Sequence, residues 1–332
     1  MKLIIPMAGR GKRLRPQSSV TPKPLLSVRG RSMVERIVAG FTGTLPRPVT
    51  ECVFILGPSF SREAEPLLTD ICARHSILPH FAVQHEALGT AHAVAVAEDH
   101  LNGEGIVAYA DTVFDMGEPA NLADCDVMVW VKHVEDPSRF GVAVREDERV
   151  VAFVEKSQEL ISHEALIGIY YVRDLSVLRS CIQHLFDHNI RGKGGEYYLT
   201  DAFDLMLRNG SAVRTTSVRH WLDCGTLDAF MDTTRHLMRT EVTAHPHGAL
   251  DRSVVIEPVY IGPGARVTDS VVGPYACIEQ DAQVTRAVVR DSILFEGAHV
   301  SGVVLQSSFV GAHATVAPPS ATVNVGDYAE VH

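Results

Sequence analysis

Short apolar runs rich in β-branched residues recur through the first two-thirds of the chain. Segments with helical spacing of apolar positions lie between several of them, including 33–41, 90–101 and 196–209. The apolar runs are 3–5, 52–56, 81–83, 106–109, 127–131, 142–144, 150–154 and 166–172. This alternation predicts a Rossmann-like α/β fold with a mixed, mostly parallel sheet flanked by helices. Ligands of such sheets bind beyond the carboxyl ends of the strands.

Beyond Asp251 the apolar residues follow a different spacing. Within each set of three the step is five or six residues, and Val272, Val288 and Val304 lie 16 residues apart. This pattern is typical of a parallel β-helix of hexapeptide repeats, in which each triplet forms one three-sided coil. A β-sandwich is the alternative, but alternation within the strands is weak. The triplets are Ile256, Ile261, Val267; Val272, Ile278, Val284; Val288, Leu294, Val300; and Val304, Val310, Val316.

The change of pattern predicts a division of the chain into domains. Residues 1–242 are expected to form the α/β domain, 243–252 a linker that contains proline and glycine, and 253–332 the β-helix. The ends of a β-helix expose strand edges, which usually pair with a partner. We therefore expect a homo-oligomer.

Composition and charge narrow the choice of partner and compartment. The chain has 332 residues and a formal net charge of −10, so it offers no broad basic surface for nucleic acid. No apolar run approaches the length of a membrane span. The six cysteines include no Cys-x-x-Cys pair, which favours buried, reduced thiols over a disulfide framework. These features predict a cytoplasmic protein that binds neither nucleic acid nor membrane.

The first apolar run leads into a loop with the composition of a phosphate cradle. Glycines at Gly9 and Gly11 let backbone N–H groups approach an anion, and cations that include Lys12 and Arg13 neutralise it. Ten residues after Arg13, Lys23 stands between two prolines. This arrangement predicts a site for a small polyphosphate.

Two aspartates and one adjacent Glu–Lys pair lie where strands are expected to end. Asp111 follows an apolar run and Asp223 precedes Gly225, so both are candidate oxygen ligands for Mg²⁺ on a nucleotide's phosphates. A helix cap or a turn is the alternative for either aspartate. Glu155 and Lys156 follow another apolar run and are expected at the same edge, although an isolated pair of this kind usually lies in solvent.

Taken in order, these and other motifs make the chain resemble the sugar-1-phosphate nucleotidylyltransferase family. The likeness is greatest to glucose-1-phosphate thymidylyltransferases and uridylyltransferases that carry a C-terminal left-handed β-helix. It implies the reaction of a nucleoside triphosphate with a sugar 1-phosphate to give a nucleoside diphosphate sugar and pyrophosphate. The motifs are AGRGKRLRP, TPKPLL, QHEALGTAHAV, ADTVF, DPSRFGV, VEKS, LIGIYYV, GEYYLTDA and HWLDCGT.

The resemblance implies roles on the nucleotide side of the site. The loop around Gly9, Gly11 and Lys12 would hold the nucleotide, and Arg13 would grip the phosphates that leave as pyrophosphate. Lys23 would hold the α-phosphate and the incoming sugar phosphate. The residues implied to bind the base and its surroundings are Gln84, Gly89 and Thr90, with Gly89 required because any Cβ would collide with the base ring.

It also implies roles on the sugar side and for the metal. Contacts to sugar hydroxyls would come from Gly141, Glu155 and Gly168. Lys156 would pair with the sugar's phosphate. The implied ligands of Mg²⁺ are Asp111 and Asp223. The implied substrates are dTTP or UTP and, by family default, glucose 1-phosphate.

The implied chemistry needs no Ser/His pair and no general base, because the attacking phosphate oxygen is already ionised at neutral pH. Two departures from the family pattern stand out: Lys12 replaces a threonine or serine, and the segment 42–50 is unlike the family's connection. Two alternatives remain open. One is a non-catalytic regulatory paralogue that binds nucleotide sugar, and the other is a bifunctional enzyme whose β-helix transfers an acyl group.

Overall fold

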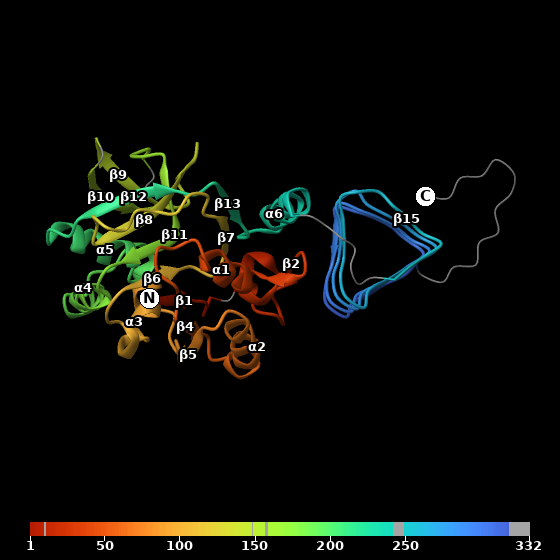
Figure 1. The fold of residues 1–332 in the computed structure, drawn as a ribbon, viewed down its shortest axis with the longest axis horizontal. Helices are drawn as coiled ribbons and strands as arrows, with labels where there is room; N and C mark the ends of the chain where they lie inside the picture. Colours follow the sequence, from red (N-terminus) through yellow and green to blue (C-terminus); the bar gives the residue numbers. More distant parts are fainter. Residues whose placement is uncertain (10, 148, 157–158, 242–248, 319–332) are drawn as a thin grey trace, which may run out of the picture. The chain divides into compact units, whose positions relative to one another are not determined.

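The computed structural model describes residues 1–9, 11–147, 149–156, 159–241 and 249–318 (Figure 1). The chain divides into two compact units, Met1–Phe230 and Met231–His332. The division falls inside helix α6 (Leu227–Thr240). Residues 242–248, which include part of the expected linker 243–252, lie outside the described residues, so the domain limits 1–242 and 253–332 stay predictions.

The described part of the first unit is built on a nine-stranded mixed sheet. Strand β1 is central and runs parallel to β4 and β6, while β5 continues the parallel part beside β4. Strand β11 runs antiparallel to β6, β8 and β9. The predicted α/β class is therefore confirmed. The strands are β1 (Lys2–Pro6), β4 (Glu51–Leu56), β5 (Leu78–Val83), β6 (Gly105–Ala108), β8 (Val127–His133), β9 (Gly141–Glu146), β10 (Arg149–Glu155), β11 (Glu164–Val172) and β12 (Val213–Ser217).

Helices cover both faces of this sheet. Helices α1 and α2 contribute to one buried cluster with the side chains of Leu3, Ile5 and Phe54, while α3, α4 and α5 contribute to another with Ile4 and Val53. Adjacent residues of one strand thus enter different clusters, as the pleat of a strand requires. The α-helices are α1 (Met33–Phe41), α2 (Ser61–Arg74), α3 (Thr90–Ala95), α4 (Leu175–Asp187) and α5 (Leu199–Arg208), and the short 3₁₀ turns are η1 (Lys12–Leu14), η2 (Lys23–Leu25), η3 (Glu98–His100) and η4 (Lys193–Gly195).

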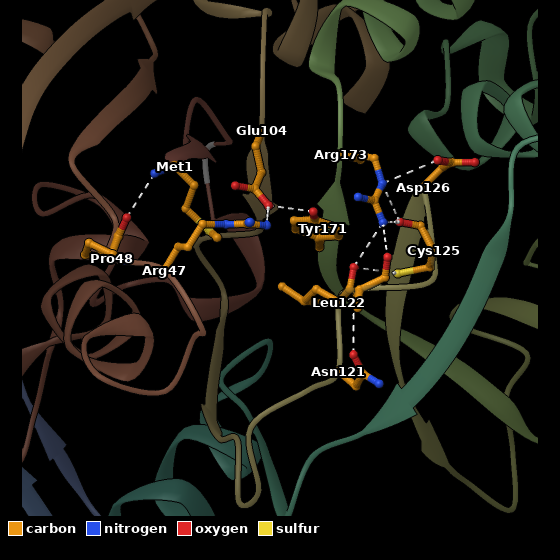
Figure 2. Close-up of polar contacts among 11 residues, drawn as sticks. Met1, Arg47, Pro48, Glu104, Asn121, Leu122, Cys125, Asp126, Tyr171 and Arg173 are labelled. Carbon is orange, nitrogen blue, oxygen red and sulfur yellow. Dashed lines mark hydrogen bonds and ion pairs between the residues drawn. The ribbon is translucent and has the colours of Figure 1, made fainter.

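The segment 42–50, unusual in sequence, connects α1 to β4, and Figure 2 shows the polar contacts of its residues Arg47 and Pro48. Arg47 forms an ion pair with Glu104, and the same carboxylate accepts a 2.6 Å hydrogen bond from the Tyr171 hydroxyl. The N-terminal amine of Met1 donates to the Pro48 carbonyl at 2.9 Å. These contacts fix the connection at the edge opposite the carboxyl ends of the parallel strands.

The six cysteines are all free and buried. Burial raises the pKa of the Cys52 thiol well above its ordinary value, which disfavours the reactive thiolate. Among the helices that the structure describes, none combines the length and apolarity needed to cross a bilayer.

The second unit contains a parallel β-helix, seen as a triangular stack in Figure 1. Its described strands form one sheet of five strands and two of four, and every neighbouring pair is parallel. The strands are β14 (Ala249–Asp251), β17 (Arg266–Thr268), β20 (Gln283–Thr285), β23 (His299–Ser301) and β26 (Thr315–Val316); β15 (Val254–Val255), β18 (Val271–Val272), β21 (Val288–Arg290) and β24 (Val304–Gln306); and β16 (Val259–Ile261), β19 (Ala276–Ile278), β22 (Ser292–Leu294) and β25 (Phe309–Val310). A β-helix is confirmed, and the β-sandwich alternative is wrong.

The register on one face of the β-helix differs from the predicted repeat of 16. Val272 pairs with Val289, which pairs with Leu305, so the first step is 17 residues and the second is 16. Val289 is fully buried, whereas Val304 is 67% exposed. The prediction that Val288 and Val304 point inward is therefore wrong. The earlier coils of the β-helix contain 17 residues instead of the predicted 16, which shifts the inward position by one residue. Ile256 is also exposed.

The adjacent valines of β21 provide a matched test of this register. We expect Val289→Ala to lower the free energy of unfolding by about 2 kcal/mol, because it removes buried apolar volume. Val288→Ala, on the partly exposed side of the same strand, is expected to change it by less than about 0.5 kcal/mol. Denaturant unfolding of both variants measures the difference. A larger loss of stability in Val288→Ala than in Val289→Ala would contradict this register and support the predicted repeat of 16 residues.

Candidate active site

The loop that follows β1 is held in place by close packing of a glycine against a lysine. Gly11 has a φ of +56°, and a Cβ at this position would lie 2.8 Å from the Cβ of Lys23. The Ser18 hydroxyl donates a 2.7 Å hydrogen bond to the Gly11 carbonyl. Glycine is thus required here both by its backbone conformation and by the space available.

Lys23 and Asp111 form the central ion pair of the site. The Lys23 Nζ lies 3.1 Å from the Asp111 Oδ2. The lysine is only 8% exposed, whereas the aspartate side chain is half-exposed. A buried ammonium needs a compensating anion, so this contact ties the loop to the carboxyl end of β6.

A cavity of about 410 Å³ opens beside this ion pair. Its walls come from the loop after β1, the ends of β5 and β6, and the start of α3. The predicted site residues that line it are Gly9, Gly11, Arg13, Lys23, Gln84, Gly89, Thr90 and Asp111.

One wall of this cavity is set by Gln84 and Gly89. The Gln84 Nε2 donates to the Gly89 carbonyl at 3.3 Å and to the Nδ1 of His92 at 3.0 Å. Burial lowers the pKa of His92, which favours the neutral ring whose nitrogen accepts this bond. The amide of Gln84 is therefore fixed in orientation.

Gly89 is required by the protein itself. Its φ is +116°, and a Cβ would lie 2.4 Å from the Tyr197 carbonyl oxygen. The neighbouring Ala91 N–H donates to that carbonyl at 3.0 Å, and Thr90 Oγ1 accepts from the Leu199 N–H at 2.9 Å. The expected reason, collision with a base ring, is thus not needed to explain the glycine: the start of α3 packs directly against the chain that enters α5.

A second cavity, of about 330 Å³, adjoins the first. Here the Glu155 Oε2 accepts a 2.7 Å hydrogen bond from the Thr200 hydroxyl, and its Oε1 lies 3.3 Å from the Lys156 Nζ. The same Nζ lies 5.1 Å from the centre of the Tyr198 ring. The predicted site residues that line this cavity and not the first are Gly141, Glu155, Lys156, Gly168 and Asp223.

Two glycines give the second cavity its shape. A Cβ on Gly141 would lie 2.7 Å from the Glu155 Oε2. Gly168 has a φ of +81°, and its Cβ would lie 2.7 Å from the Tyr109 ring. Both positions therefore exclude any larger residue without movement of a wall residue.

The two cavities form one bipartite cleft, because the same side chains border both. The shared lining residues are Arg13, Thr90, Tyr109, Asp111, Glu196 and Gly225. A cation and an aspartate thus stand at the junction, where a ligand that spans both cavities would carry its phosphates.

The candidate magnesium ligands come from neighbouring strands. Asp223 ends β13 (His220–Asp223) and pairs with Thr112 of β7 (Thr112–Asp115), the residue directly after Asp111. The Asp223 Oδ1 accepts a 2.9 Å hydrogen bond from the Gly225 N–H, in a turn. Mg²⁺ in nucleotide enzymes is usually held by one or two carboxylates with water and phosphate oxygens, so these two side chains fit it.

All predicted site residues except Lys12 line this cleft; the side chain of Lys12 lies outside the described part of the structure. The lining residues that were not predicted as part of the site include the polar side chains of Tyr109, Glu196, Tyr198 and Thr200. Thr200 is the second residue of α5, which begins at Leu199 inside the predicted helical segment 196–209. Burial raises the pKa of Tyr109, so its hydroxyl stays protonated.

An α/β sheet with a glycine-rich basic loop and paired carboxylates at one edge is the architecture of an enzyme that handles phosphates. Residues 2–240 match the family model for nucleotidyl transferases, and the chain therefore belongs to the nucleotidyl transferase family.

Individual relatives agree with this assignment. The chain is 24% identical over 363 residues to a glucose-1-phosphate thymidylyltransferase of Streptomyces antibioticus, with 100% of this chain and 99% of that protein covered. It is 27% identical over 239 residues to the UTP–glucose-1-phosphate uridylyltransferase AglF of Haloferax volcanii, with 68% and 91% covered. The solved structure of a UDP-glucose pyrophosphorylase complexed with UDP-glucose matches with a TM-score of 0.59 at 18% identity, covering 72% of this chain and 99% of that chain. This last likeness supports the fold alone.

The packing of Gly89 gives a testable prediction. Gly89→Ala is expected to lower the free energy of unfolding by about 1–3 kcal/mol, because the new Cβ meets the Tyr197 backbone in a strained conformation. Gly9→Ala is the matched control, since a Cβ there has nothing within 4 Å. Chemical denaturation compares them, and equal stability of the two variants would contradict this account of the loop.

Proposed function

We propose that the protein transfers a nucleotidyl group from dTTP or UTP to a sugar 1-phosphate, with glucose 1-phosphate as the favoured acceptor. The products are a nucleoside diphosphate sugar and pyrophosphate. The observation that carries the proposal is the bipartite cleft, whose two cavities meet at Arg13 and Asp111. A two-substrate reaction at phosphorus needs this arrangement, with one cavity for each substrate and charge at the junction.

The first cavity is assigned to the nucleoside triphosphate. The loop at Gly9 and Gly11 lies under the phosphates, and Arg13 is placed to neutralise the β and γ groups that leave. Gln84, held in orientation by its hydrogen bonds to Gly89 and His92, is assigned to the edge of the base. Thymine and uracil present the same donor and acceptor pattern there, so both are proposed substrates.

The second cavity is assigned to the sugar 1-phosphate. Glu155 is an acceptor for sugar hydroxyls, and its position is fixed by Thr200 and Lys156. The backbones at Gly141 and Gly168 allow a sugar ring to approach closely. Lys156 lies beside Glu155 with a half-exposed side chain, which suits it to pair with the sugar's phosphate.

The reaction needs alignment and charge neutralisation, with no protein base. A phosphate oxygen of the sugar 1-phosphate attacks the α-phosphorus, a new P–O bond forms, and the bond from that phosphorus to the β-phosphate oxygen breaks with its electron pair. Arg13, Lys23 and Lys156 orient the two substrates and offset the charge that develops. Asp111 and Asp223 would hold Mg²⁺, which would supply further neutralisation of the phosphates.

A grid of nucleoside triphosphates against sugar 1-phosphates tests the proposal. With Mg²⁺ present, pyrophosphate is expected to appear when dTTP or UTP is combined with a hexose 1-phosphate, and only when both substrates are present. No release in any combination, together with tight nucleotide binding that Asp111→Ala leaves unchanged, would favour the regulatory paralogue. Consumption of an acyl donor would support the bifunctional alternative.

The loop arginines provide a matched pair of variants. Arg13→Ala is expected to lower kcat/KM by about a hundredfold or more, because loss of one charge-assisted contact at a reacting phosphate costs roughly 2–4 kcal/mol. Arg15 is also exposed but is absent from the described walls of both cavities, so Arg15→Ala is expected to stay within about twofold of the parent. Initial rates of pyrophosphate release measure kcat/KM of both variants. An equal loss of kcat/KM in the two variants would contradict the role proposed for Arg13.

A further inference from the structure

Three side chains with metal-binding atoms converge away from the cleft. Glu51, His80 and His100 each offer a ligand atom, and these atoms all lie within 4.8 Å of one another. The Glu51 Oε2 lies 3.1 Å from the His80 Nε2. The imidazole rings of His80 and His100 are 4.3 Å apart between centres, at an interplanar angle of 38°. Among the residues that the structure describes, this is the one group of three or more such ligands.

The fold brings the three residues to one face of the sheet. His80 of β5 pairs with Val53 of β4, and Glu51 precedes Val53 by two residues, so Glu51 and His80 point to the same side. Val53 packs in the cluster to which α3 contributes, and His100 comes from η3, which follows α3 along the chain. Residues from two strands and a turn therefore meet at this face.

The cluster is separate from the cleft. Glu51 is the first residue of β4, whereas the cleft lies beyond the carboxyl ends of the parallel strands. No residue of the cluster lines either cavity as described. The proposed reaction at phosphorus therefore does not involve Glu51, His80 or His100.

The donor set matches a transition metal better than magnesium. Two imidazole nitrogens and one carboxylate oxygen are a known ligand combination of Zn²⁺, which takes water as its fourth ligand. Mg²⁺ prefers oxygen ligands. The side chains of His80 and Glu51 are 26% and 33% exposed, so an ion can enter from solvent while most of each side chain stays ordered by packing.

Lys2, a cation whose charge acts on His100, is not itself one of the three ligands. The Lys2 Nζ donates to the carbonyl and the side-chain oxygen of Asn102 at 3.0 and 2.7 Å. These two bonds hold the ammonium at Asn102. The Glu51 carboxylate provides the negative charge that a divalent ion requires at this position.

We infer that Glu51, His80 and His100 form a zinc-binding site that ties η3 to strands β4 and β5. Its occupation fixes the turn that follows α3, whose first residue, Thr90, borders the cleft. The metal takes no part in the proposed transfer reaction, and its binding is independent of that proposal.

Zinc binding is tested on the full chain after removal of any histidine tag and of bound metal with a chelator. Calorimetric titration with ZnCl₂ is expected to give one ion per chain and a raised melting temperature, and MgCl₂ is expected to leave the melting temperature unchanged in the absence of nucleotide. Co²⁺ is expected to give visible d–d absorption from the same site. Each of His80→Ala, His100→Ala and Glu51→Gln is expected to weaken zinc binding at least about tenfold.

A second histidine pair provides the control. His184 of α4 and His188, the residue directly after α4, stack with ring centres 4.0 Å apart, but they belong to no three-ligand group in the described structure. His188→Ala is therefore expected to bind zinc as the parent does. The variant His100→Ala keeps the Glu51–His80 hydrogen bond. A loss of zinc binding in this variant therefore cannot be caused by loss of that hydrogen bond.

Three results would overturn the inference. The first is no saturable zinc binding by the parent chain. The second is unchanged binding in both His80→Ala and His100→Ala, and the third is loss of binding in His188→Ala. Metal-free melting temperatures show whether each variant is folded, and pyrophosphate release is measured separately.

Discussion

The ion pair between Lys23 and Asp111 is the contact on which the cleft depends. It joins the loop after β1 to the carboxyl end of β6, and the 3.1 Å separation leaves a buried ammonium matched by a half-exposed carboxylate. The lysine also explains the glycine beside it, because its Cβ occupies the space that a side chain at Gly11 would need. A partly buried pair of this kind is costly to break from one side, since the remaining charge loses its partner. The loop, the lysine and the aspartate therefore form one packed assembly.

This assembly stands where the two cavities meet, and that position links the fold to the proposed chemistry. Parallel strands bring their carboxyl ends to one edge, so a loop, an aspartate and the start of a helix converge there although they are far apart in sequence. The antiparallel strands β9, β10 and β11 extend the same edge and carry Gly141, Glu155 and Gly168. A mixed sheet thus builds two adjoining pockets from one continuous edge.

Much of the fold was predictable from the apolar runs. Much of the cleft was predictable because glycines and charged residues follow these runs, where the strands end. The β-helix was predictable as a class, but its register was not: a single extra residue per turn in the early coils moves Val289 inward and Val288 outward. The reason for Gly89 was missed because Tyr197 is distant in sequence and contacts the glycine through its backbone. Tyr109 ends a predicted apolar run and Glu196 lies in the motif GEYYLTDA, but neither pattern says that these side chains line the cleft. The Glu51, His80 and His100 group likewise depends on strand register and on a turn, which spacing along the chain does not reveal.

The central claim is that one cleft holds both substrates, with the base at Gln84, the sugar at Glu155 and the phosphates at the junction. A structure of the full chain with dTDP-glucose or UDP-glucose bound tests it most directly. The account predicts the base in the larger cavity, the sugar within hydrogen-bond distance of Glu155, and the diphosphate beside Arg13 and Lys23. Base and sugar in the same cavity, or exchanged between the two, would contradict it.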